Sequence, residues 1–125
     1  MSDDQFAKGE KMRRAVLGDA HVDRSMGKVN DFNRPIIDYI TKYAWGDVWT
    51  RPGLERKTRS ILNLGMLAAL GRENELKIHI RGALRNGVTK EEMSEIFLQV
   101  AVYCGAPASL EAFKIAEEVF AEEGI

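Results

Sequence analysis

Arg72-Glu73-Asn74-Glu75-Leu76-Lys77-Ile78-His79 opens the segment whose pattern decides the fold. Apolar side chains recur at Leu76, Ile80 and Leu84, four residues apart, with charged residues between them. A spacing of three or four is the period of a helix with one apolar face. Residues 72–86 are therefore predicted to form an amphipathic helix, with a glycine directly after it as the C-terminal stop.

Three chemically active side chains share one face of this predicted helix. Arg72, Glu75 and His79 stand at i, i+3 and i+7, so their side chains lie one above the other. A cation, a carboxylate and an imidazole on one stripe could hold an anionic substrate and move a proton, with Glu75 orienting the imidazole. The alternatives are a solvated salt-bridge stripe and a structural histidine.

The rest of the chain also shows helical periodicity, and no alternating strand pattern is present. Short connections between amphipathic helices are typical of a bundle. We therefore predict an all-α bundle of six helices. The expected helices are residues 2–19, broken near Gly18, 29–43, 54–70, 72–86, from Thr89 to about Gly105, and from Pro107 through Phe120.

Local signals set the boundaries of these helices. Thr89 and Glu92 have the spacing of a capping box, in which each side chain accepts a hydrogen bond from the other residue's backbone. His21–Asp23 is expected to be a connector, and Ala44–Gly53 an aromatic loop of the kind that often carries binding groups. Residues 1–125 are predicted to form a single domain, with a helical arm over 1–50 and a core over 54–122.

Composition excludes several classes of function. The 125 residues carry 18 basic and 19 acidic side chains without a basic run, so the charge pattern of a nucleic-acid binder is missing. No apolar run reaches the 18 residues that suggest a membrane span, and the N-terminus lacks the pattern of a secretory signal. A cytoplasmic protein without nucleic-acid or membrane partners is expected.

Cysteine and histidine counts exclude further chemistry. One cysteine and two histidines make neither a disulfide framework nor the usual zinc site. No Gly-rich phosphate-binding fingerprint follows a predicted strand. We expect neither a metal nor a cofactor.

Four segments resemble the carboxymuconolactone decarboxylase family. The likeness extends from about Gly27 to Val119 and rests on residues 49–59, 67–72, 75–84 and 99–107. The wider superfamily of alkylhydroperoxidase-like proteins has the redox motif C-x-x-C-x-x-x-H. Its histidine falls on His79, whereas its two cysteines fall on Arg72 and Glu75. The redox thiols are absent, and Cys104, about 25 residues away, does not replace them.

This resemblance implies a fold and a reaction. The fold is a six-helix bundle of the alkylhydroperoxidase-like type that oligomerises through apolar helices, as a trimer or hexamer. The reaction is the loss of CO2 from 4-carboxymuconolactone, a small anionic lactone, to give the enol-lactone of 3-oxoadipate. The lactone takes up the electron pair itself, so no cofactor is implied.

The resemblance also suggests roles for particular side chains. His79 would be the general acid/base, oriented by Glu75, and an arginine would bind the second carboxylate. Arg72, Arg59 and Arg51 are the candidates for that carboxylate-binding arginine.

Other candidates have equally plausible structural roles. Glu55 stands near the upstream acid of the superfamily, but it also suits a helix N-terminus. Tyr103 could donate to an oxyanion or lie in the core. Trp49, with Trp45, could wall the pocket or make a subunit contact. Cys104 is expected to be buried and inert, and His21 is given no role.

Two other functions compete with the decarboxylase. The first is a non-catalytic helical oligomer of the same fold that acts in binding or assembly, because the apolar helix 61–70 needs cover on most sides. The second is a peroxidase-like protein, which the missing cysteine pair disfavours.

Overall fold

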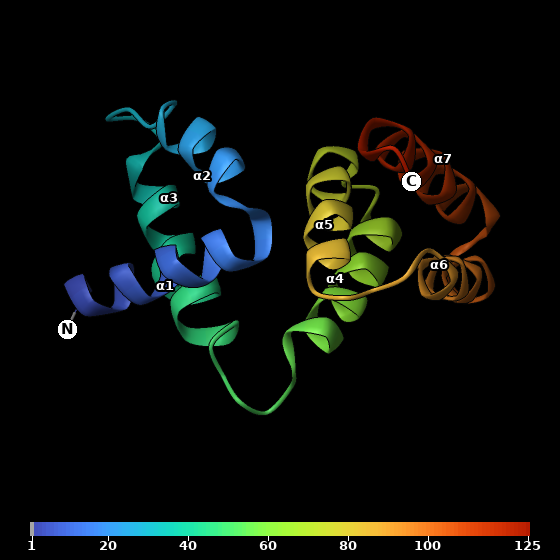
Figure 1. Cartoon of the computed structure of the whole chain (residues 1–125), viewed down its shortest axis with the longest axis horizontal. Helices are drawn as coiled ribbons and strands as arrows, with labels where there is room; N and C mark the ends of the chain where they lie inside the picture. Colours follow the sequence, from blue (N-terminus) through green and yellow to red (C-terminus); the bar gives the residue numbers. More distant parts are fainter. Residues whose placement is uncertain (1) are drawn as a thin grey trace. The chain divides into compact units, whose positions relative to one another are not determined.

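The computed structural model describes residues 2–125, in which helices are joined by short connections and no strand is present (Figure 1). This confirms the predicted all-α class. The chain divides into a first compact unit that ends at Arg56 and a second unit, Lys57–Ile125.

The prediction of six helices is wrong, because residues 2–125 form seven α-helices and one π-helix. His21–Asp23, expected as a connector, lies inside a helix, because residues 19–26 contain neither glycine nor proline. The first half of the expected loop, residues 44–48, is helical as well. The elements are α1 (Ser2–Leu17), α2 (Asp19–Met26), α3 (Arg34–Tyr39), the π-helix η1 (Ile40–Val48), α4 (Arg56–Leu70), α5 (Glu73–Arg85), α6 (Lys90–Cys104) and α7 (Ala106–Glu123).

The first unit is organised by a close crossing of α1 over η1. Gly9 of α1 lies against the backbone of Thr41, where an added Cβ would overlap the Thr41 carbonyl oxygen. Gly46 of η1 approaches α1 equally closely, since its Cβ would lie 2.6 Å from the Gln5 carbonyl oxygen. The Gln5 side chain donates a 3.0 Å hydrogen bond to the Lys42 carbonyl of η1. Only glycine permits this approach of two backbones.

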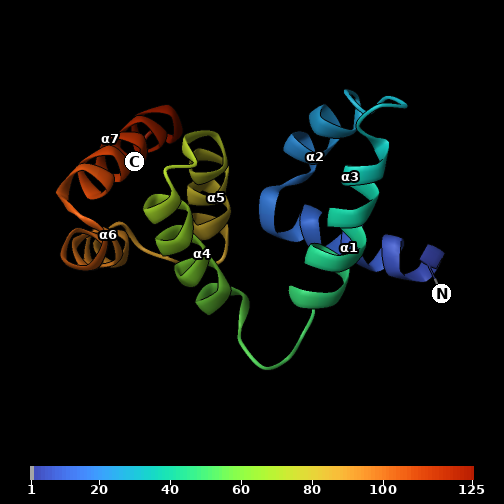
Figure 2. The ribbon, with the colours of Figure 1, turned by 180° about the vertical axis from the view of Figure 1, so that it is seen from behind.

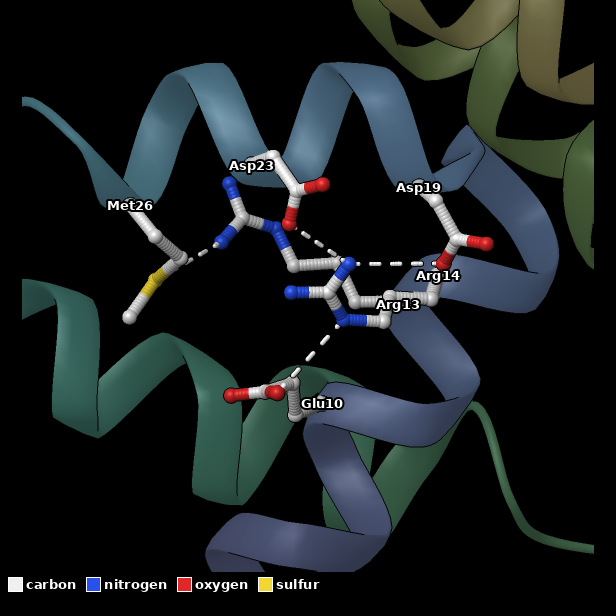
Figure 3. A network of polar contacts seen from close by, with 6 residues as sticks. All are labelled: Glu10, Arg13, Arg14, Asp19, Asp23 and Met26. Atoms are coloured by element: carbon white, nitrogen blue, oxygen red, sulfur yellow. Dashed lines mark hydrogen bonds and ion pairs between the residues drawn. The ribbon is translucent and has the colours of Figure 1, made fainter.

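Polar contacts fix the turn from α1 into α2. Arg14 of α1 pairs with Asp23 at 2.8 Å and with Asp19 at 3.3 Å, and both aspartates are on α2 (Figure 3). The neighbouring Arg13 donates a 2.8 Å hydrogen bond to Ser25. The Asp23 hydrogen bond is the main cause that raises the pKa of Arg14. These contacts hold α2 against α1 after the chain bends.

The second unit has an apolar core to which each of its four helices contributes. Leu64 of α4, Ile80 of α5, Phe97 of α6 and Val119 of α7 are completely buried. Phe97 packs edge-on against Phe113, with ring centroids 5.7 Å apart. Burying a side chain of this size stabilises the fold by about 1.5–3 kcal/mol. The core therefore fixes how α4 and α5, which carry the candidate site, are placed.

Helix ends in the second unit follow the predicted signals. Thr89 Oγ1 accepts a 3.0 Å hydrogen bond from the Glu92 backbone, and a Glu92 carboxylate oxygen accepts one of 2.9 Å from the Thr89 backbone. Gly71 follows α4 with φ +69°, and Pro107 lies in the first turn of α7. The capping box and both boundary predictions are confirmed.

Replacing Gly9 by alanine is expected to destabilise the first unit by about 2–3 kcal/mol, because the new Cβ forces α1 away from η1. Gly27→Ala is the matched control, because Gly27 has ordinary φ and its Cβ would make only a van der Waals contact. Both tryptophans of the chain lie in this unit, so urea unfolding followed by tryptophan fluorescence reports on it. Equal midpoints for the two variants would contradict the close crossing.

Glu92→Gln is expected to lower stability at neutral pH but not in acid. The backbone hydrogen bond from Thr89, and then Lys57, lower the pKa of Glu92 in the folded state. Stabilisation from this carboxylate is therefore present above the ordinary glutamate pKa, and it is lost as pH falls through the lowered value. Urea unfolding followed by circular dichroism should show that the variant and wild type approach the same free energy of unfolding as pH falls through this range. Glu91→Gln lies outside the capping box. Its loss in free energy of unfolding relative to wild type should be smaller and should change less with pH.

Candidate functional site

His79 lies on α5 and faces α4. Figures 1 and 2 both show α4 and α5 side by side. The imidazole is half-buried, and its Nδ1 atom lies 3.0 Å from the side-chain amide nitrogen of Asn63 on α4. Toward the other end of the helix pair, Asn86 donates a 2.9 Å hydrogen bond to the Ser60 hydroxyl. Two asparagine side chains thus bridge the two helices, and one of them holds His79.

Asn63 was missed by the sequence analysis. It sits between Leu62 and Leu64 in a helix that is otherwise mostly apolar. An amide in such a place is stable only if it is hydrogen-bonded, so the isolated polar residue was a signal that a partner faces it. The sequence does not show which partner that is.

Only two of the three side chains that were predicted to share one helical face belong to the helix. α5 begins at Glu73, and Arg72 is its N-cap residue, with φ −88° and ψ 79°. Arg72 is therefore not on the helical face, and its prediction as the first member of the stripe is wrong. Glu75 and His79 do stand one turn apart on α5. Glu75 is exposed in the first turn, and the hydrogen bond described at Nδ1 of His79 comes from Asn63.

The surroundings of Arg72 are acidic. Glu73 faces Glu111 of α7, and a hydrogen bond between the two carboxyl groups raises the pKa of Glu73, against the opposing effect of Lys114. Both glutamates line cavities of about 380 and 110 Å3, and Arg72 lines the smaller one. Two carboxyl groups beside a guanidinium weaken its attraction for an anion. This arrangement disfavours Arg72 as a carboxylate ligand.

Arg59 is better placed relative to His79. It lies on α4 one turn before Asn63, so the two side chains share a face of that helix. Arg59 is half-buried, and its Nε atom is fully buried. A partly buried guanidinium interacts more strongly with a carboxylate than an exposed one does.

Tyr103 and Cys104 lie at the end of α6, away from this face. Tyr103 is 81% exposed, which excludes the core position that was one of its two predicted alternatives. Cys104 is also exposed, so its predicted burial is wrong. Both line an apolar groove of about 410 Å3 together with Leu62 and Met66 of α4. Leu62 and Met66 are about half exposed along this groove.

The remaining candidates belong to the first unit. Trp49 follows η1 and stacks on the buried Trp45, with ring centroids 4.9 Å apart. Arg51 and Glu55 are exposed in the segment between η1 and α4. The Trp45–Trp49 stack is a packing contact within its own unit, whereas His79 belongs to the second unit.

Two absences among the described residues concern membranes and metals. No helix within residues 2–125 is long and apolar enough to cross a membrane. In the described part of the chain, no three His, Cys, Asp or Glu side chains gather as a potential metal site.

Comparison with known proteins identifies the family. A family model described as the carboxymuconolactone decarboxylase family matches residues 35–118. The chain is 48% identical to 4-carboxymuconolactone decarboxylase of Acinetobacter baylyi over 126 residues, which cover all of this chain and 94% of that protein. It is 44% identical to nitrosuccinic acid decarboxylase of Metarhizium robertsii, over 90% of this chain and 79% of that protein. A 43-residue stretch, 34% of this chain, is 54% identical to 4-carboxymuconolactone decarboxylase of Pseudomonas putida and covers 90% of that protein. The chain belongs to the carboxymuconolactone decarboxylase family.

Proposed function

We propose that this protein is a carboxy-lyase that decarboxylates 4-carboxymuconolactone to the enol-lactone of 3-oxoadipate. The observation that carries the proposal is the 48% identity, over the whole chain, to a protein named for this reaction. The half-buried His79, held between two helices of the second unit, agrees with a group that transfers a proton.

The chemistry of the lactone sets three demands on the site. Loss of CO2 leaves an electron pair that is delocalised through the ring onto the lactone oxygen. The protein must therefore protonate a ring carbon, stabilise the developing oxyanion and hold the second carboxylate. His79 is the proton donor in this proposal. Glu75 stands one turn earlier on α5.

Arg59 is the proposed ligand of the second carboxylate. It shares a face of α4 with Asn63, the hydrogen-bond partner of His79. Arg72 is disfavoured because it lines the same cavity as the carboxyl groups of Glu73 and Glu111. The roles predicted for Arg51, Trp49, Glu55 and Tyr103 stay predictions.

Dicarboxylates with a different electron acceptor are a second candidate substrate class, favoured by the 44% identity to a nitrosuccinic acid decarboxylase. A nitro group and a conjugated lactone both accept the electron pair left by CO2, and both compounds keep a second carboxylate. The same proton donor and arginine would serve either acid. Comparing kcat/KM for the lactone and for nitrosuccinate decides between the two, with the lactone expected to be the better substrate.

His79→Ala is expected to lower kcat for the lactone about 100-fold or more, because the proton donor is removed. The thermal midpoint should fall no further than in Asn86→Leu, which breaks the other asparagine bridge between these helices. CO2 release and loss of the substrate absorbance measure the effect. His21→Ala, which removes the other histidine of the chain, should keep near-normal turnover. Near-normal turnover in His79→Ala would overturn the assignment.

We further propose that copies of the chain associate through the apolar groove between α4 and α6, giving a trimer or hexamer. The groove is lined mainly by apolar side chains, among them Leu62, Met66 and Ile96. Apolar patches of this kind are typical of subunit contacts. A non-catalytic assembly protein of the same fold would also associate here, so only the activity assay separates the two functions.

Leu62→Lys is expected to break the assembly, because a lysine charge would be buried in the contact. Sedimentation velocity should show a smaller species than wild type. The Cys104 thiol should react with a thiol reagent slowly in wild type and quickly in the variant. Val102→Lys, on α6 but outside the groove, is the control and should keep the wild-type size. An unchanged size for Leu62→Lys would exclude this surface.

A further inference from the structure

We infer that Asn63 is a positioning residue for His79: it binds Nδ1 of the imidazole and so assigns proton exchange with the substrate to Nε2. The observation is the 3.0 Å contact between the Asn63 amide nitrogen and His79 Nδ1. The role in catalysis rests on the proposed decarboxylation, whereas the effect on the imidazole is independent of it.

The contact is built into the helix pair. Asn63 comes from α4 and His79 from α5, 16 residues apart in sequence, and both side chains are half-buried. The buried Leu64 and Ile80, next to these residues in sequence, fix both helices in the apolar core. Because the backbones on both sides are fixed, the ring cannot turn away without breaking the hydrogen bond and leaving the amide unsatisfied.

An amide suits a histidine that changes its protonation state. With its nitrogen facing the ring, Asn63 donates to the unprotonated Nδ1 of the neutral imidazole, so the ring proton is on Nε2. After the amide turns over, its oxygen accepts from the Nδ1–H group of the imidazolium. A carboxylate would instead favour the imidazolium, and an alkyl group would bind neither form. Asn63 therefore holds the ring in both states.

Proton transfer to the substrate then takes place at Nε2 alone. The bond between the ring carbon and the carboxylate breaks, CO2 leaves, and the electron pair is delocalised onto the lactone. The imidazolium gives its Nε2 proton to a carbon of the dienolate, which forms a C–H bond and leaves a neutral imidazole whose remaining proton is on Nδ1. Solvent returns the proton. During this transfer the Nδ1–H group keeps its hydrogen bond to the Asn63 oxygen, and the amide turns its nitrogen to the ring when the neutral ring carries its proton on Nε2.

Charged side chains stand close to this pair along its own two helices. Glu75 lies one turn before His79 on α5, and Arg59 lies one turn before Asn63 on α4. Lys77 and Arg81 of α5 turn toward α7, where both pair with Glu122. Their contribution to the titration of His79 is the same in wild type and in Asn63 variants, so a change between these proteins reports on Asn63.

Asn63→Asp and Asn63→Leu test the inference, with Asn86→Leu as the matched control. Asn86 bridges the same two helices through Ser60 but does not touch His79. Nitrogen NMR of the imidazole, without substrate, should show the neutral ring protonated on Nε2 in wild type and in Asn86→Leu. In Asn63→Asp the ring proton should move to Nδ1, and the titration of His79 should move to higher pH.

Kinetics with the lactone form the second arm. Asn63→Leu is expected to lower kcat by about 10- to 100-fold with little change in KM, because the proton donor loses its orientation. In Asn63→Asp the limb of the pH–kcat profile that His79 controls should move to higher pH. Asn86→Leu should lose stability to a similar degree as Asn63→Leu yet keep both kcat and the profile.

The outcomes separate the two proposals. A neutral ring that carries its proton on Nδ1 in wild type, or an unchanged titration in Asn63→Asp, overturns the role of Asn63. An equal loss of kcat in Asn86→Leu reduces Asn63 to a structural bridge. If the NMR shifts appear as expected but wild type releases no CO2 from the lactone, the proposed function fails while the positioning of the imidazole stands.

Discussion

The pairing of α4 with α5 is the constraint on which the candidate site depends. Apolar packing around Leu64 and Ile80 supplies the free energy of this pairing, but apolar contacts alone tolerate small sliding and rotation of helices. Two asparagine bridges, from Asn63 to His79 and from Asn86 to Ser60, add directional contacts about two helical turns apart along α5. The core thus sets the distance between the helices, and the bridges set their register and the direction of the imidazole.

Helix boundaries that depend on residues nearby in the sequence could be predicted from the sequence. The capping box at Thr89, the stop at Gly71 and the start at Pro107 all act through backbone groups within a few positions of themselves. The apolar face of α5 followed from periodicity for the same reason. These signals need no knowledge of the rest of the chain.

Features that depend on distant residues could not be predicted. The aromatic segment Ala44–Gly53 resembles a loop in sequence, but residues 44–48 belong to the π-helix η1, whose backbone packs against Gly9 of α1. Cys104 looked like a small core residue, yet no helix of its unit covers it. Asn63 and His79 meet across two helices, and neither residue's own neighbours in sequence specify the other. In each case, the missing information is a tertiary contact.

The same distinction applies to the candidate site. The sequence identified His79, because its position matched the histidine of a known motif, but it placed Arg72 on a helix that starts one residue later. A substrate with two carboxylates makes the choice of groups around the imidazole a matter of charge. A carboxylate bound to Nδ1 would repel the substrate and hold the imidazolium too firmly to release its proton. A neutral amide avoids both effects, and a nearby guanidinium such as Arg59 then supplies the attraction. Asn63 and Arg59, one turn apart on α4, are the pair of groups that such a site needs beside its histidine.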